Sequence, residues 1–282
     1  MSVLRPELFK NCVAIVTGGG TGIGRAITYE LLTLGAKVVI ASRSAEKLQI
    51  AVDEFAKVGS GNITSIPCNI RKENEVRSLI SETLKRHGKI DFLVNNGGGQ
   101  FLSPAADMTL KGWNAVIETN LTGTYLMMRE TYTQWMRDNG GAIVNIIADM
   151  WRGFPMMSHT GAARAAVLNL TKSVSVEWAQ DGVRVNCVAP GVIQSPTAAA
   201  NYNVDVFEEA KKRLPSWRTG RPDEVSGAVC FLLSPAARFI SGTCLNIDAA
   251  GSLYSPLFHN VDEHDKLPEY KWIPDPPKQS KL

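Results

Sequence analysis

The stretch Thr17-Gly18-Gly19-Gly20-Thr21-Gly22-Ile23-Gly24 decides the fold of this 282-residue chain. An apolar run of buried-strand length precedes it in residues 12–16, and apolar residues at helical spacing follow it in residues 25–32. Glycines are needed where the backbone turns sharply or approaches a ligand with no Cβ in the way. A helix that begins at about Gly22 would direct free N–H groups and the positive end of its dipole at a phosphate. Strand, loop and helix thus stand in the order of a dinucleotide site, and the alternative is a plain tight turn.

Apolar runs of strand length alternate with amphipathic helical segments along the rest of the chain. This alternation predicts an α/β fold, a doubly wound (Rossmann-type) parallel sheet with helices on both faces, in a single domain over residues 1–255. Residues 256–282 are polar and rich in proline, so we expect a tail there. The expected strands are residues 12–16, 37–42, 63–68, 91–95, 142–147, 183–188 and 244–248. The expected helices are residues 45–57, 73–87, 111–137, 158–178 and 222–233, with a partly helical insert at 194–221.

Composition excludes several classes of function. The chain is 44% hydrophobic and 20% charged, and its net charge of +3 is too small to indicate binding to nucleic acid or to a membrane surface. No apolar run approaches the roughly 20 residues of a membrane span. The five cysteines form no CxxC pair and the four histidines have no ligand spacing, so we expect no metal site.

The chain ends in Ser280-Lys281-Leu282, a tripeptide that peroxisomal import receptors read. It stands at the end of a polar segment that should be exposed. The sequence therefore predicts a peroxisomal location and an import receptor as a partner.

The second expected strand ends in Ala41-Ser42-Arg43. An NAD site of this kind has Asp or Glu there, which accepts a hydrogen bond from the ribose 2′-OH. Ser42 and Arg43 suit a 2′-phosphate instead, which favours NADP(H), although Arg43 could also be an exposed residue at a helix start. Asn69, which is followed by Ile70, comes after the third strand and could bind the adenine or simply form a turn.

The order and spacing of four motifs resemble the short-chain dehydrogenase/reductases over residues 10–250. The motifs are Thr17 to Gly24, Asn95-Asn96-Gly97, Asn120 and Pro190-Gly191. Within that family the chain is similar to the peroxisomal trans-2-enoyl-CoA reductases, on residues 95–104, 118–124 and 161–164 and on its ending. The 2,4-dienoyl-CoA reductases look similar but less close. The resemblance implies a homodimer or homotetramer.

The family's proton donor is absent. The family has a Tyr four residues before a Lys, whereas this chain has Thr160 and Arg164 there, and Ala148 where a Ser is usual. If the motif is aligned on Lys172 instead, the Lys is present but Leu168 occupies the position of the Tyr. Ketone reduction would lack its general acid, while reduction of a C=C bond conjugated to a thioester needs donors for a developing enolate oxygen. We therefore expect an NADPH-dependent trans-2-enoyl-CoA reductase acting on an acyl-CoA; the alternatives are a 2,4-dienoyl-CoA reductase and a non-catalytic NADP-binding homologue.

The resemblance and the residues together predict a set of catalytic residues and a set of cofactor-binding residues. Arg164 would hold the nicotinamide ribose, and Asn120 would support it. Lys172 is as well explained by a charge on the helix surface as by a role in the site. Thr160 could donate from its hydroxyl but is a weak acid, and Asp149 is better explained as a loop carboxylate than as a catalytic residue. The predicted catalytic residues are Asn120, Arg164, Lys172 and Thr160. The predicted cofactor-binding residues are Thr17, Gly18, Gly20, Thr21, Gly22, Ile23, Gly24, Ser42, Arg43, Asn69, Ile70, Asn95, Gly97, Arg164, Pro190, Gly191 and Ile193.

Overall fold

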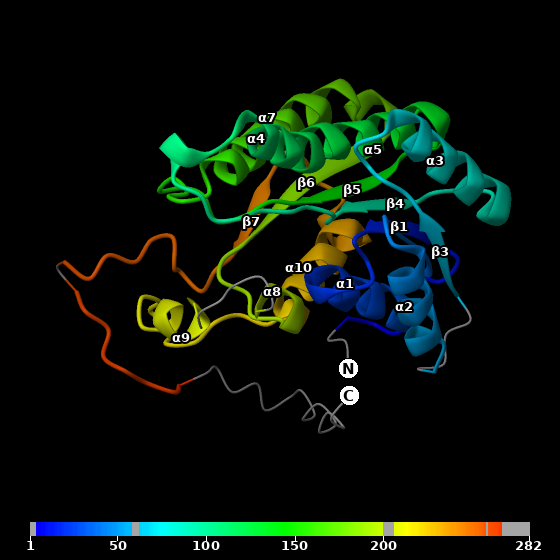
Figure 1. Ribbon diagram of the computed structural model, residues 1–282. Helices are drawn as coiled ribbons and strands as arrows, with labels where there is room; N and C mark the ends of the chain where they lie inside the picture. Colours follow the sequence, from blue (N-terminus) through cyan, green and yellow to red (C-terminus); the bar gives the residue numbers. More distant parts are fainter. Residues whose placement is uncertain (1–3, 58–61, 200–205, 258, 267–282) are drawn as a thin grey trace.

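The computed structural model places one parallel sheet between two layers of helices (Figure 1). It describes residues 4–57, 62–199, 206–257 and 259–266. The seven strands lie in the order β3-β2-β1-β4-β5-β6-β7, and every neighbouring pair is parallel. The expected doubly wound α/β fold is therefore confirmed. The predicted Ser280-Lys281-Leu282 signal lies outside the described residues.

The strands begin and end within two residues of their predicted positions. They are β1 (Val13–Thr17), β2 (Lys37–Ser42), β3 (Ile63–Pro67), β4 (Phe92–Asn95), β5 (Gly141–Ile146), β6 (Val183–Pro190) and β7 (Cys244–Ile247). The central strands are buried along their whole length, because helices cover both faces of the sheet. Such strands are continuously apolar, which is why they could be recognised in the sequence.

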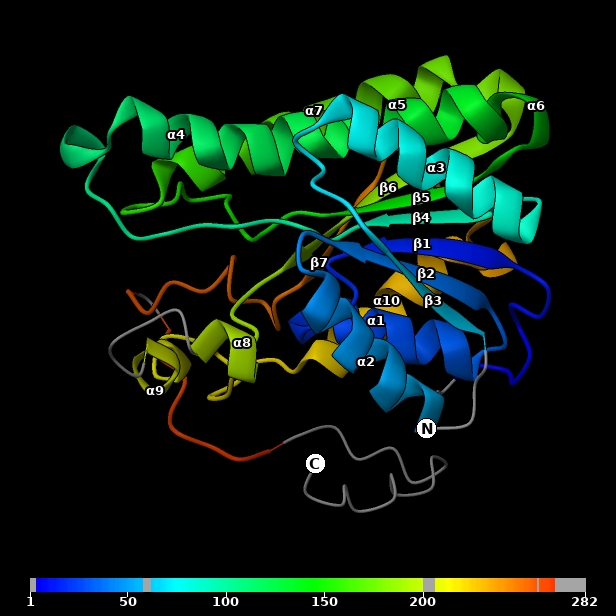
Figure 2. The same cartoon turned by 45° about the vertical axis from the view of Figure 1, so that its right-hand side comes forward.

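Helices on the two faces enclose two separate apolar cores (Figures 1 and 2). On one face lie α1 (Gly22–Thr33), α2 (Ala45–Lys57) and α10 (Pro222–Leu233). On the other lie α3 (Glu73–His87), α7 (Ser158–Glu177) and a long helix described below. Three short 3₁₀ helices, Ala105–Asp107, Ala179–Asp181 and Pro235–Ala237, complete the connections. No helix in the described ranges combines the length and the apolarity that crossing a bilayer would need.

The predicted helix over residues 111–137 contains two π-helical turns. It runs through α4 (Leu110–Ile117), η2 (Glu118–Thr122), α5 (Gly123–Thr131), η3 (Tyr132–Met136) and α6 (Arg137–Asn139). The first π turn carries Asn120, which is completely buried. Isolated π turns occur frequently at functional sites, because the extra residue redirects a side chain.

The insert after β6 closes on itself at its base. Gln194 N–H donates to Gly220 O (2.9 Å), and Gly220 N–H donates to Val192 O (2.9 Å). Its described helices are α8 (Pro196–Ala199) and α9 (Val206–Lys211). The segment that follows β7 packs on the insert, since Trp217 Nε1 donates to Val261 O (2.9 Å). Val261, near the beginning of the predicted tail, thus contacts the insert.

Candidate active site

A groove of about 500 Å³ runs over the carboxyl ends of β1, β2 and β4. It lies where the strand order reverses between β1 and β4, the place at which open parallel sheets bind ligands. The predicted residues that line it are Thr17, Gly18, Gly20, Thr21, Gly22, Ile23, Ser42, Arg43, Asn69, Ile70, Gly97 and Ile193. Gly24, Asn95, Arg164, Pro190 and Gly191 are not among the residues that line the groove.

The glycine loop forms a tight cradle at the start of α1. Gly18 and Gly22 have φ angles of 65° and 52°, which side chains rarely permit. A Cβ on Gly24 would fall on the carbonyl oxygen of Gly18 and beside Asn96 Nδ2. Thr21 gives α1 no side-chain cap and the first turn has no acidic residue, so its N–H groups are available to an anion.

Thr17 and Asn96 join the ends of β1 and β4. Thr17 Oγ1 accepts from Asn96 N–H (3.0 Å) and Gly97 N–H (2.8 Å), while Asn96 Nδ2 donates to Thr17 O (3.0 Å). Asn95, which we predicted to bind the cofactor, instead donates from Nδ2 to Asn145 Oδ1 (2.8 Å) inside the core. Asn96 lines the groove and was missed, although it stood in the Asn95-Asn96-Gly97 motif.

The far end of the groove carries two free cations. Arg43 and Lys47 both line it, and no ion pair in the described part of the chain involves either. Arg71 also lines it, but its Nε donates to Glu118 Oε2 (2.8 Å). Ser44 Oγ accepts from Lys47 N–H (3.3 Å) and so closes the start of α2. Two unpaired cations beside the hydroxyls of Ser42 and Ser44 fit a ribose 2′-phosphate.

Asn69 forms a turn, which is one of the two roles that the sequence left open. Its Oδ1 accepts from Arg71 N–H (3.2 Å), and its N–H donates to Glu75 Oε2 (2.8 Å), as in a side-chain-stabilised turn. It also lines the groove, next to Ile70.

Asn120 and Thr160 meet at the buried end of the site. Asn120 Oδ1 accepts from Gly99 N–H (2.9 Å), and its Nδ2 donates to both Gly99 O (2.9 Å) and Thr160 Oγ1 (2.9 Å). Thr160 is completely buried. Both side chains therefore fix the loop after β4 to α7, and the Thr160 hydroxyl is engaged inside the protein.

Arg164 lies one turn of α7 beyond Thr160 and reaches the edge of the groove. Its Nη1 donates to Ile146 O, at the end of β5, and a Cβ on groove-lining Gly98 would collide with its Nη2. Burial lowers the pKa of Arg164 to about 10, so the guanidinium stays protonated at neutral pH. A guanidinium in this position can bind the ribose next to the nicotinamide.

The other candidates lie outside the groove. Lys172 is exposed two turns farther along α7. Asp149 N–H donates to Pro190 O (2.9 Å), and burial, followed by the charge of Asp248, raises the pKa of its carboxyl. Gly191 N–H donates to Ile247 O (3.0 Å), so Pro190 and Gly191 position Ile193 from the end of β6. In the described residues, no group of histidine, cysteine or carboxylate side chains could hold a metal ion.

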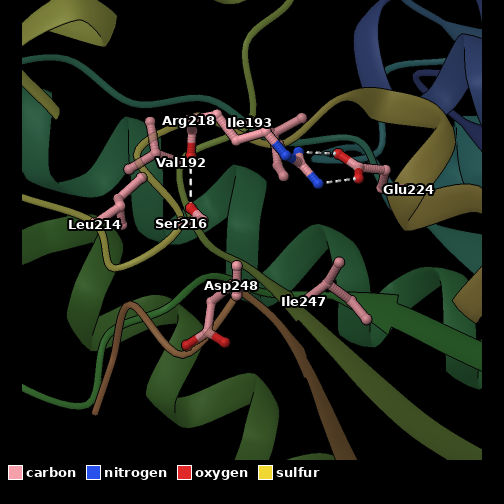
Figure 3. A pocket seen from close by; sticks show the side chains of 10 residues that line it. Val192, Ile193, Leu214, Ser216, Arg218, Glu224, Ile247 and Asp248 are labelled. Carbon is pink, nitrogen blue, oxygen red and sulfur yellow. Dashed lines mark hydrogen bonds and ion pairs between the residues drawn. The ribbon is translucent and has the colours of Figure 1, made fainter. Parts of the chain in front are cut away.

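A smaller cavity of about 90 Å³, which Ile193 also lines, lies at the base of the insert (Figure 3). Arg218 makes a two-pronged ion pair with Glu224, at 2.8 and 2.6 Å. Glu224 also accepts from Arg221 N–H (2.8 Å), which caps α10. One carboxylate therefore fixes the end of the insert to the start of α10.

Sequence reasoning missed the contribution of the insert to the groove. Ser195, Thr197 and Ala198 line it, and a Cβ on Gly22 would lie 3.5 Å from Ser195 Oγ. The hydroxyls that follow Ile193 were the available signal. Lys47 could have been found as a cation one turn into the helix after Arg43.

Comparison with known proteins supports the architecture of this site. A family model described as enoyl-(acyl carrier protein) reductase matches residues 18–250. A peroxisomal 2,4-dienoyl-CoA reductase [(3E)-enoyl-CoA-producing] from Danio rerio is 35% identical over 256 residues, 90% of this chain and 85% of that protein. The citronellol catabolism dehydrogenase AtuB from Pseudomonas aeruginosa PAO1 is 44% identical with a TM-score of 0.81, covering 89% of this chain and 99% of the other.

A third similar structure is that of an actinorhodin polyketide ketoreductase with NADPH. It is 28% identical with a TM-score of 0.81, and the match covers 89% of this chain and 100% of the ketoreductase. The position of the groove, the parallel sheet and the matching family model all indicate the same family. The chain therefore belongs to the short-chain dehydrogenase/reductase family of oxidoreductases, within the group that the enoyl-(acyl carrier protein) reductase model describes.

Proposed function

We propose that this protein is an NADPH-dependent reductase of the 2,3 double bond of trans-2-enoyl-CoA. The observation that carries the proposal is the combination of a glycine-lined groove at the switch in strand order with a missing proton donor. The groove presents Arg43 and Lys47, which have no ion-pair partner among the described residues, while Thr160 is buried at the position where the family has its Tyr.

The replacement of Tyr by Thr160 argues against ketone reduction. A ketone oxygen must be protonated as hydride arrives, which requires an acid of suitable pKa within hydrogen-bond reach. Thr160 is a poor acid, and its Oγ1 accepts from Asn120 Nδ2 within the buried cluster. Ketoreductase activity should therefore be weak.

Reduction of an activated double bond places different demands on the chain. NADPH bound in the groove supplies a hydride to the β-carbon of the enoyl thioester. Negative charge then develops on the thioester oxygen, which fixed hydrogen-bond donors stabilise, and the α-carbon takes its proton from water. Arg164 holds the nicotinamide ribose, and Asn120 keeps the loop after β4 in place beside it.

The same chemistry extended by one double bond gives the second candidate, a 2,4-dienoyl-CoA reductase. The name of the similar protein from Danio rerio favours it. The hydride acceptor would then be the δ-carbon, and a 3-enoyl-CoA would be the product. The two candidates share every residue role given above.

A substrate comparison tests the proposal. The purified protein is incubated with NADPH and a trans-2-enoyl-CoA, a 2,4-dienoyl-CoA or a ketone of similar length. We expect NADPH oxidation with the enoyl-CoA and little with the ketone. Turnover of the dienoyl-CoA alone would select the second candidate. Stabilisation by NADPH with no turnover of any acyl-CoA would indicate a non-catalytic NADP-binding homologue.

Location and assembly are further parts of this proposal. The peroxisomal relative supports a peroxisomal site of action, with import through a receptor for the chain's last three residues. Removal of Leu282 from a fluorescent fusion should then leave it in the cytosol. We also propose a homodimer or homotetramer built from the domain of residues 1–255, which light scattering would measure.

A further inference from the structure

His159 has a ring nitrogen that is buried and has no partner. The residue is completely buried in the first turn of α7. Its Nδ1 accepts from Thr160 N–H (2.8 Å), a hydrogen that is shared with Met157 O (3.0 Å). Its Nε2 is one of the few buried side-chain nitrogen or oxygen atoms in the described residues without a hydrogen bond. Buried polar groups are normally satisfied, so this nitrogen needs an explanation.

The hydrogen bond at Nδ1 determines which nitrogen carries the proton. Because Nδ1 accepts, the neutral imidazole has its hydrogen on Nε2. A neutral imidazole at a helix N-terminus can polarise a carbonyl group through the N–H of its other nitrogen. Nε2–H is therefore a fixed donor without an acceptor.

The neighbouring side-chain donors of the site have other partners or another assigned role. Asn120 gives its amide hydrogens to Gly99 O and Thr160 Oγ1. Arg164 Nη1 donates to Ile146 O, and its Nη2 lies beside Gly98. Because Asn120 is engaged and the proposed function assigns Arg164 to the nicotinamide ribose, the buried Nε2–H of His159 is a further donor at the start of α7 for a developing negative charge on the substrate.

We propose that His159 Nε2–H donates a hydrogen bond to the thioester oxygen of the acyl-CoA. The inference rests on the proposed function and adds the group that stabilises the enolate. Bound NADPH would supply the hydride to Cβ; as the π electrons move toward Cα and the thioester oxygen, His159 would stabilise that oxygen while it keeps its own proton. A water-derived proton then forms the Cα–H bond, so NADPH and one proton are consumed for each acyl-CoA formed.

Phe101 covers the imidazole in the free protein. Its ring packs edge-to-face on His159, with centroids 4.5 Å apart and planes at 88°. It belongs to the loop after β4 and is 42% exposed. An aromatic ring is at best a weak hydrogen-bond acceptor, so a thioester oxygen can replace it. Substrate entry would displace the Phe101 ring and bring the oxygen to Nε2.

Two variants of His159 separate catalysis from structure. His159→Leu should lower kcat about 100-fold, the usual effect of removing one oxyanion donor. His159→Gln should retain a kcat within about tenfold of wild type, because its amide nitrogen can replace an Nε2–H donor. Affinity for NADPH should be unchanged in both, and His259→Leu, at an exposed position, is the control. Equal kcat values for His159→Leu and wild type would overturn the inference.

Chemical modification tests access to the nitrogen without measuring activity. Diethyl pyrocarbonate should modify His259 but not His159 in the wild-type protein. In Phe101→Ala, His159 should become modified, and a saturated acyl-CoA with NADP⁺ should protect it. Continued protection of His159 in Phe101→Ala, or no effect of the acyl-CoA, would contradict the inference. If wild type itself reduces no enoyl-CoA, the proposed function fails instead.

Discussion

The groove and the cluster around Asn120 use hydrogen-bond donors in opposite ways. In the groove, the N–H groups that begin α1 have no side-chain cap, and the exposed cations of Arg43 and Lys47 have no ion-pair partner within the part of the chain that the structure describes. In the cluster, the side chains of Asn120 and Thr160 bond to one another and to Gly99. The first region is prepared for a phosphate-bearing ligand, whereas the second is a rigid support. The difference teaches that binding resides in backbone geometry here, while the choice of reaction depends on a few side chains.

The largest effect should follow from filling the glycine cradle. Gly24→Ala would place a methyl group on Gly18 O, which costs about 3 kcal/mol of stability by overpacking and should abolish dinucleotide binding. Thermal unfolding and NADPH titration measure the two effects. Gly227→Ala is the matched control, because the helical position in α10 has open space and should gain about 1 kcal/mol. Tight NADPH binding by Gly24→Ala would refute the role of the cradle.

Removal of the Asn120 side chain should lower the catalytic rate without weakening cofactor binding. Asn120→Ala loses three hydrogen bonds and leaves Gly99 groups unpaired, so we expect about 2 kcal/mol of destabilisation. The value of kcat should fall more than tenfold, with the Kd for NADPH unchanged. Asn139→Ala, on an exposed position of the same long helix, should change neither. If NADPH affinity fell as much as kcat, the two regions would not be separable.

The cations at the far end of the groove should control cofactor choice. Arg43→Ala and Lys47→Ala should each weaken NADPH binding about tenfold, or about 1.4 kcal/mol, and leave NADH binding nearly unchanged. The loss of NADPH affinity caused by each substitution should be smaller at high salt, since both cations are exposed. Lys72→Ala, which removes an exposed cation paired with Glu75, is the control. Equal losses for NADPH and NADH would show that these residues do not contact a 2′-phosphate.

The smallest effect concerns strain next to the nicotinamide end of the groove. Ala250 has a φ of 63°, in a turn whose neighbour Asp248 packs against Gly191. Ala250→Gly should raise the free energy of unfolding by about 1 kcal/mol, because glycine adopts this conformation without strain. The same change in the last turn of α2, Ala56→Gly, should lower the free energy of unfolding by up to about 1 kcal/mol. Urea unfolding of the two variants would measure the opposite signs.

The sheet and the cofactor groove could be predicted because their signals are local. A buried parallel strand is continuously apolar, and a phosphate cradle requires glycines at fixed spacing. Asn95 and Asn96 could not be distinguished in this way, since their roles depend on which side of β4 each side chain faces. The same holds for Lys172 and for the seryl and threonyl residues after Ile193. Their positions follow from how α7 and the insert pack, which a single sequence does not specify.

His159 illustrates the same limit within one turn of helix. The sequence places it beside Thr160, but its unpartnered Nε2 emerges only when Nδ1 is seen to accept a backbone N–H. Asn120 differs, because its spacing from the other motifs singled it out in the sequence, and the structure places it in a buried cluster with Gly99 and Thr160.

The most direct test of the account follows a label from cofactor to product. The protein is incubated with NADPH carrying deuterium at the transferred position and with trans-2-enoyl-CoA, and the acyl-CoA product is analysed by mass spectrometry and NMR. The account predicts one deuterium per NADPH consumed, located at C3 of a saturated acyl-CoA. NADPH oxidation that leaves the acyl chain unlabelled would contradict it.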